Sequence, residues 1–162
     1  IFTHLHLDHA GQAYMYRDSA FLIAHRLELQ HALVQMWEGK TGAYVPVDLE
    51  PLRGARWVLV DEERLELLPG IELIHTGGHT PGHMVVKVTA PGGDVWYFMG
   101  DFFHMPEEFQ AESKGWLLYN GDQFESFTRK MKFWASSKRV HMVITHDPTN
   151  WQKYPRIPKP LF

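Results

Sequence analysis

Near its beginning, the chain places four residues of metal-binding type within six positions. The segment THLHLDHAG, residues 3–11, contains His4, His6, Asp8 and His9. Neutral imidazole and carboxylate are the nitrogen and oxygen ligands that zinc and similar ions take. On an extended segment, residues two apart point the same way, so we expect His4, His6 and Asp8 to share one face, with His9 turning toward the same centre. The segment predicts a metal site, and the rest of the chain must supply its remaining ligands.

Further residues of the same type follow short apolar runs that are typical of strands. His79 lies in TGGHTPGH, after a strand expected to end near His75, and Asp101 and His146 follow the runs in FMGD and VITH. A single aspartate after a strand is commonly a turn or cap residue. Loops on a rigid scaffold are nevertheless where binding sites are built. The repetition of ligand-type residues at strand ends therefore supports the metal site.

The composition excludes several other kinds of protein. The 162 residues contain no cysteine, so any metal must be held by histidines and carboxylates. With a net charge of −3 and no basic tract, nucleic acid is not expected as a partner. No apolar run reaches the length of a membrane span. The missing cysteines fit a cytoplasmic protein, although a chain that begins without methionine leaves a lost signal peptide as an alternative.

Strand-like and helix-like segments mix along the chain, which predicts the α/β or α+β class. The spacing of bulky residues predicts a helix over 25–38 and a second helix over 121–137 whose aromatic face enters the core. We interpret residues 40–56 as a long surface loop, and the tail after Asp147 shows no periodicity. Strands are expected at residues 1–3, 20–24, 57–60, 64–68, 71–75, 84–89, 95–99 and 140–144.

The motifs HLHLDH, GHTPGH, GD and the late TH together resemble the metallo-β-lactamase fold superfamily in order and separation, over essentially the whole chain. The resemblance implies a four-layered αβ/βα sandwich with metal ions at one edge of its two sheets. It also implies strands ahead of the first motif, which this chain lacks. We therefore expect residues 1–162 to be a single domain of this fold, truncated at its N-terminus and unable to close the sandwich alone.

The same resemblance implies two divalent metal ions and a ligand for each position around them. The ligands of the first ion are His4, His6 and His79, those of the second are Asp8, His9 and His146, and Asp101 bridges both. His83, the second histidine of GHTPGH, is expected to be a hydrogen-bonding neighbour of the ligands. Zinc is the first choice of metal, and iron, manganese and cobalt stay open because they accept the same ligands.

Within the superfamily, the order and length of the segments most resemble the N-acyl homoserine lactonases. This resemblance implies a hydrolase that opens an ester-like bond, first of all a lactone. A glyoxalase II-like thioesterase, another hydrolase of this fold, and a metal-binding sensor without activity stay open as alternatives. The expected partner is a small ester or lactone, and a homodimer is left open.

One position departs from the lactonase pattern. The lactonases usually carry a tyrosine three residues after the bridging aspartate, where this chain has His104. Histidine can donate a proton near neutral pH, which makes His104 a candidate catalytic residue. Asp8 is the other candidate, and a bystander role for His104 stays open. Phe102, Phe103 and Met105 surround this position. We interpret them as contacts for an acyl chain, with a place in the core as the alternative.

Overall fold

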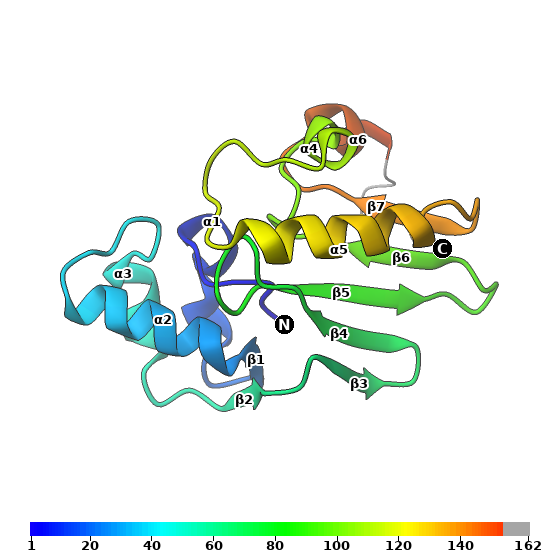
Figure 1. The fold of residues 1–162 in the computed structure, drawn as a ribbon. Helices are drawn as coiled ribbons and strands as arrows, with labels where there is room; N and C mark the ends of the chain where they lie inside the picture. Colours follow the sequence, from blue (N-terminus) through cyan, green and yellow to red (C-terminus); the bar gives the residue numbers. More distant parts are fainter. Residues whose placement is uncertain (154–162) are drawn as a thin grey trace.

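The structure, a computed structural model, describes residues 1–153, which form two sheets with helices packed around them (Figure 1). The smaller sheet pairs β1 (Leu22–His25) in parallel with β2 (Trp57–Val60). The larger sheet holds five strands in chain order, which are β3 (Arg64–Leu68), β4 (Ile71–His75), β5 (Met84–Thr89), β6 (Val95–Phe98) and β7 (Val140–Val143). The predicted mixed α/β class is confirmed.

The directions of the strands in the larger sheet decide where the predicted ligands meet. Neighbours from β3 to β6 are antiparallel, and β7 runs parallel to β6. Strands β4, β6 and β7 therefore all end at the same edge of the sheet. His79, Asp101 and His146 follow these three strand ends, so the topology alone brings three distant segments of the chain together.

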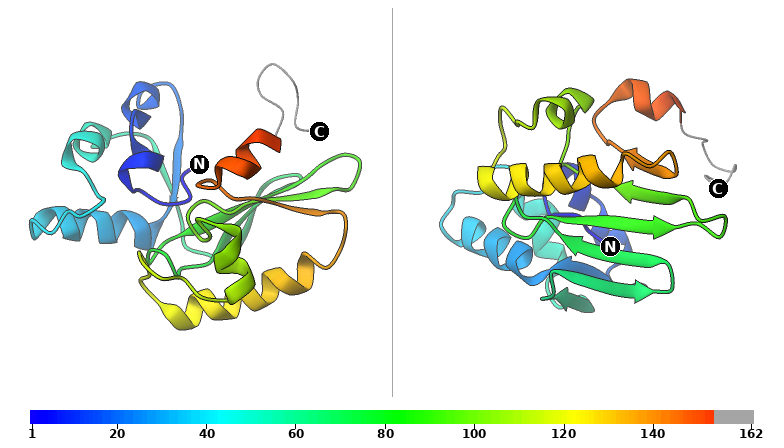
Figure 2. Two further views of the ribbon diagram at one scale, coloured as in Figure 1. Left: turned by 90° about the horizontal axis from the view of Figure 1, so that it is seen from above. Right: turned by 45° about the vertical axis from the view of Figure 1, so that its right-hand side comes forward.

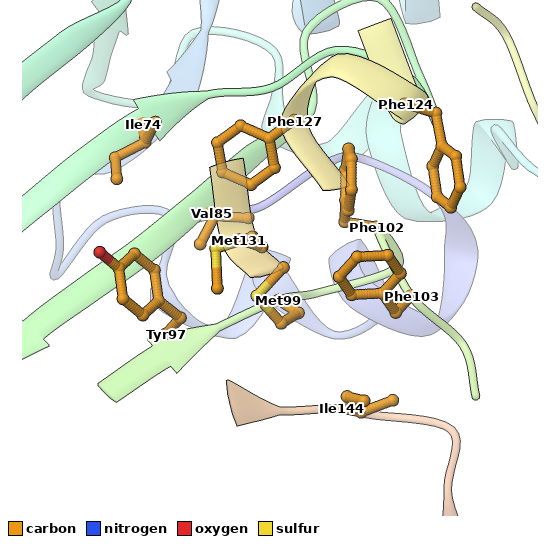
Figure 3. Close-up of a cluster of buried hydrophobic side chains, with 10 residues drawn as sticks. All are labelled: Ile74, Val85, Tyr97, Met99, Phe102, Phe103, Phe124, Phe127, Met131 and Ile144. Atoms are coloured by element: carbon orange, nitrogen blue, oxygen red, sulfur yellow. The ribbon is translucent and has the colours of Figure 1, made fainter. Parts of the chain in front are cut away.

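Helix α5 (Gly121–Trp134) lies lengthwise on one face of the larger sheet (Figures 1 and 2). The Asn120 side chain caps its first turn by accepting a hydrogen bond from the Gln123 N–H. Its buried residues pack against the strands and the loop after β6 in one apolar cluster (Figure 3), whose members are Ile74, Val85, Tyr97, Met99, Phe102, Phe103, Phe124, Phe127, Met131 and Ile144. This core fixes the sheet edge that carries the candidate ligands.

The remaining helices are short, except for one. The longer helix is α2 (Arg26–Trp37), and the short ones are α1 (Leu7–Ala10), η1 (Ala13–Tyr16), α3 (Pro46–Leu49), η2 (Glu50–Leu52), α4 (Pro106–Ala111) and α6 (Pro148–Lys153). Helix α6 occupies the start of the tail that shows no periodicity, and the rest of that tail lies outside the described residues. Among residues 1–153, no helix is long and apolar enough to cross a membrane.

The expectation of a strand at residues 1–3 is wrong. The Phe2 N–H donates to the Ile23 carbonyl at 2.8 Å, and the Thr3 carbonyl accepts from the Met84 N–H at 2.8 Å. The segment thus makes one bond to each sheet instead of a ladder with either. Its effect is to hold the following histidine motif between the two sheets.

The prediction of a helix over 25–38 is confirmed, but its bulky residues do not form the buried face. Leu27 and Trp37 are exposed, whereas Glu28 and Ala32 are buried. The expected surface loop over 40–56 is wrong in part, because α3 and η2 lie within it and both Tyr44 and Leu52 are buried. This segment covers α2 and the histidine motif, which is a packing role that local sequence does not reveal.

Candidate metal centre

The first group of candidate ligands comes from the loop before α1 and the loop after β4. The His79 Nε2 atom lies 3.2 Å from His4 Nε2 and 3.2 Å from His6 Nδ1. All three side chains are buried, and their ring nitrogens lie within 4.8 Å of one another. The lone pairs of ring nitrogens this close repel each other unless a proton or a cation lies between the nitrogens. The predicted ligands His4, His6 and His79 are therefore together and have the spacing for one ion.

Burial keeps these three histidines in the form that binds metals. It lowers the pKa of His79 to about 3, the pKa of His6 to about 4 and the pKa of His4 well below its usual value. Neutral imidazole is the form that binds metals. The His79 Nδ1–H donates to the Leu117 carbonyl at 2.8 Å, so its Nε2 lone pair faces the group. The donor set fits a divalent cation.

The second group brings Asp8 and His9 of α1 next to Asp101 and His146. The Asp8 Oδ2 atom lies 3.3 Å from His146 Nε2 and 3.4 Å from His9 Nε2. The expectation that Asp8 shares a face with the first two histidines is wrong. The chain turns into a helix at Leu7, and a helix rotates each residue by about 100° instead of alternating faces. Asp8 therefore lies in the second group, which agrees with the ligand set that the resemblance implies.

Asp101 lies between the two groups, with one carboxylate oxygen facing each. Its Oδ1 atom is 2.8 Å from His9 Nε2 and 3.0 Å from His146 Nε2. Its Oδ2 atom is 3.7 Å from His79 Nε2 and 3.8 Å from His4 Nε2. This is the arrangement that a carboxylate bridging two cations requires.

His104 contacts the same carboxylate from the cavity side. Its Nε2 atom lies 3.1 Å from Asp101 Oδ2, its ring stacks on Trp116, and its Nδ1 atom is 3.5 Å from Glu108 Oε1. Burial acts to lower the pKa of His104, but the contacts with Asp101 and Glu108 raise it overall. Burial acts to raise the pKa of Asp101, but hydrogen bonds with His104 and His9 hold it well below its usual range. His79, Asp101 and His104 also form a third set of possible ligands.

Two charged residues near the site, Lys114 and Glu108, belong to no motif in the sequence. Lys114 is buried, and its Nζ donates to the backbone carbonyls of Asp101 and Phe102. It also lies 3.8 Å from Glu108 Oε2, the atom that accepts the His104 N–H at 2.7 Å. Burial lowers the pKa of Lys114 to about 8. Both residues sit in segments with no metal motif, so only the folded chain shows that they surround the site.

His83 is fully buried beside the first group. Its Nδ1 atom lies 2.7 Å from the Thr76 hydroxyl, and its ring centroid lies 5.4 Å from that of His4. Among the described residues, its Nε2 atom has no hydrogen-bond partner. The structure places His83 next to the candidate ligands and outside the three ligand groups.

The interpretation of Phe102 and Phe103 as substrate contacts is corrected by their burial. Neither side chain has exposed surface, and both belong to the apolar core in Figure 3. Met105 is 42% exposed and lines a cavity of about 530 Å³ beside the candidate ligands. The residues around this cavity are His6, Leu7, Asp8, Ala43, Asp101, His104, Met105, Glu108, Trp116, Leu117 and His146. The alternative of a core position was therefore right for the two phenylalanines.

The comparison with protein families identifies the fold. The family model described as the metallo-beta-lactamase superfamily matches residues 1–154. The chain belongs to the metallo-β-lactamase superfamily. The N-acyl homoserine lactonase AttM of Rhizobium radiobacter is 23% identical over 97% of this chain and 60% of its own length. The N-acyl homoserine lactonase AiiB of Agrobacterium fabrum is 25% identical over 91% of this chain and 55% of its own. The chain thus spans less than two thirds of these curated relatives.

Two solved structures have the same fold as this chain. An N-acyl homoserine lactone hydrolase with the product N-hexanoyl-L-homoserine at its catalytic metal centre aligns with a TM-score of 0.81 and 21% identity, over 97% of this chain and 58% of that one. A probable metal-dependent hydrolase from Staphylococcus aureus aligns with a TM-score of 0.72 and 20% identity, over 90% and 53%. The predicted superfamily and its mixed α/β fold are confirmed.

Proposed function

We propose that this protein is part of a metal-dependent hydrolase that opens a lactone, with an N-acyl homoserine lactone as the first candidate substrate. The observation that carries the proposal is the position of Asp101, between two groups of ligand-type side chains and on the wall of a cavity. Superfamily membership and the lactonase relatives support the same reaction class.

The donor set supports two divalent cations, zinc first. His4, His6 and His79 would hold one, Asp8, His9 and His146 would hold the other, and Asp101 would touch both. Two such cations activate a water molecule and polarise a carbonyl oxygen. The protein's own residues must then orient the lactone and supply a proton to the oxygen that leaves the acyl carbon.

Two residues on the cavity wall are placed to handle that proton. Asp8 is exposed, and its carboxylate can carry a proton between the attacking and the leaving oxygen. His104 reaches the same space from the opposite side of Asp101, and its stacking on Trp116 holds its ring in place. We propose Asp8 as the proton carrier and His104 as the alternative donor.

The cavity suits a small molecule with an apolar chain. Its volume of about 530 Å³ falls within the range of small-molecule sites. The exposed side chains of Leu7, Met105, Trp116 and Leu117 give the cavity an apolar part, and it is also lined by the candidate ligands His6, Asp8, Asp101 and His146. We propose that the acyl chain of the substrate contacts these apolar side chains and that its ester-like group binds at the candidate ligands.

The proposal is tested by measuring hydrolysis by the full-length protein after loading with zinc, manganese or cobalt. The substrates are an acyl homoserine lactone, a thioester and a phosphodiester of similar size. We expect the lactone to have the highest kcat/KM, and a chelator to abolish its turnover. A preference for the thioester would favour the glyoxalase II-like alternative. Metal binding without turnover of any substrate would favour a sensor and contradict the proposed reaction.

A further inference from the structure

Helix α2 buries a carboxylate that the sequence motifs do not include. Glu28 has no exposed surface, yet its two oxygens accept four hydrogen bonds. Oε1 accepts from the Leu5 N–H at 2.9 Å and from the Tyr44 hydroxyl at 3.0 Å. Oε2 accepts from the Thr80 hydroxyl at 2.6 Å and from the Gly82 N–H at 3.2 Å. A buried carboxylate is costly unless it is hydrogen-bonded, and here every partner is a donor.

Three of these partners, Leu5, Thr80 and Gly82, belong to the two segments that form the first ligand group. Leu5 lies between His4 and His6, and Thr80 directly follows His79. The two segments are more than 70 residues apart in the chain, and their ring nitrogens approach to 3.2 Å. One carboxylate therefore ties together the backbones on both sides of this contact.

A third segment adds a contact from the side. Tyr44 uses its hydroxyl to bond Glu28, while its ring packs edge-on against His6 with centroids 4.7 Å apart. The loop at Gly82 approaches α2 so closely that a Cβ there would lie 2.2 Å from the Glu28 nitrogen. The loop is thus pressed against the helix where the carboxylate accepts its N–H.

We propose that Glu28 is a positioning residue that sets the spacing of His4, His6 and His79 and so determines how tightly this group binds a divalent cation. The inference depends on the metal centre of the proposed function. Leu5 lies between His4 and His6 and is four residues away from His9 of α1, and none of the four donors lies next to Asp101 or His146 in the chain. The effect of Glu28 is therefore directed at one of the two ions.

The variant Glu28→Gln tests the carboxylate with little change in volume. Glutamine has one acceptor oxygen and an amide that donates, so it cannot accept from both the Leu5 and the Gly82 N–H through separate oxygens. Residues that hold metal ligands in position typically change metal affinity about 10–100-fold when they are altered. We expect a loss of that size for one ion, and affinity within about twofold of wild type for the other.

The measurement is competition for Zn²⁺ and Co²⁺ between the full-length protein and a chromophoric chelator, with the stoichiometry read from the titration. The matched control is Thr128→Val, which removes a fully buried hydroxyl that donates to the Phe124 carbonyl within α5. Thermal unfolding of the metal-free proteins gives the stability that each variant loses. We expect Thr128→Val to bind both ions as wild type does, even though it loses a buried hydrogen bond.

Three outcomes would overturn the inference. If folded Glu28→Gln binds both ions as tightly as wild type, Glu28 has only a structural role. If Glu28→Gln does not fold, the variant to measure is Tyr44→Phe, which removes one of the four hydrogen bonds and keeps the ring. Unchanged affinity of Tyr44→Phe for both ions would also contradict the inference. If wild type itself takes up no ion, the proposed function fails together with this inference, which separates that failure from the first two.

Discussion

Replacing His104 with alanine tests how the proton reaches the leaving oxygen. His104 is 5% exposed and lines the cavity, and its Nε2 atom lies 3.1 Å from Asp101 Oδ2. If it donates the proton, loss of a general acid lowers kcat by about 10²–10⁴. That range corresponds to about 3–5 kcal/mol of activation free energy. The assay is steady-state hydrolysis of an acyl homoserine lactone, with metal content measured on the same samples.

A second substrate separates chemistry from positioning. A nitrophenyl ester has a leaving group that needs little protonation, so we expect His104→Ala to slow its hydrolysis far less than that of the lactone. His104→Tyr should restore part of the lactonase rate, because a phenol hydroxyl can donate from the same side of the cavity.

Three results would refute this reasoning in different ways. Equal losses for both substrates would mean that His104 positions the substrate. No loss for either would make His104 a bystander and leave Asp8 as the proton carrier. A fall in metal content would mean that His104 is a ligand, as its place in a possible group with His79 and Asp101 allows.

The other predictions concern the ligands, the core and a surface ion pair. His79→Ala should lower metal content and activity together. His75→Ala should keep both, because His75 bonds the Pro81 carbonyl and lies outside the ligand groups. The reverse result would contradict the ligand assignment. Phe103→Ala should lower the free energy of unfolding in denaturant by about 3–5 kcal/mol, because the side chain is fully buried, and a loss near zero would place it outside the core. Burial acts to raise the pKa of Glu72, but hydrogen bonds from Lys87 and Arg64 lower it overall. The stability that this ion pair contributes is thus present above the unfolded pKa of about 4.3 and is lost as the pH falls through the folded pKa. The difference in free energy of unfolding between wild type and Glu72→Gln should therefore shrink below about pH 4. A difference in free energy of unfolding that stays constant down to about pH 2 would contradict this role of the ion pair.

The sequence by itself predicted a metal site and most of the regular structure. The histidines and aspartates were recognisable as candidate ligands because their order and spacing form a pattern that chance rarely produces. The aromatic helix over 121–137 was recognisable because its apolar residues repeat with the period of a helix, and the strands of the larger sheet because short apolar runs lie between turn residues. These signals are local, and they survive in the unfolded chain.

Only the tertiary structure decided which side chains face the cavity and which support the ligands. Phe103 and Met105 are apolar neighbours in one loop, and packing against α5 buries the first and leaves the second exposed. Glu28 belongs to no motif in the sequence, yet three segments distant from it in the chain converge on its carboxylate. Burial and convergence depend on which strands become neighbours, and strand pairing between distant segments leaves no periodic trace in the sequence. The physical environment of a side chain is therefore a property of the whole fold, whereas its chemistry is already fixed in the chain.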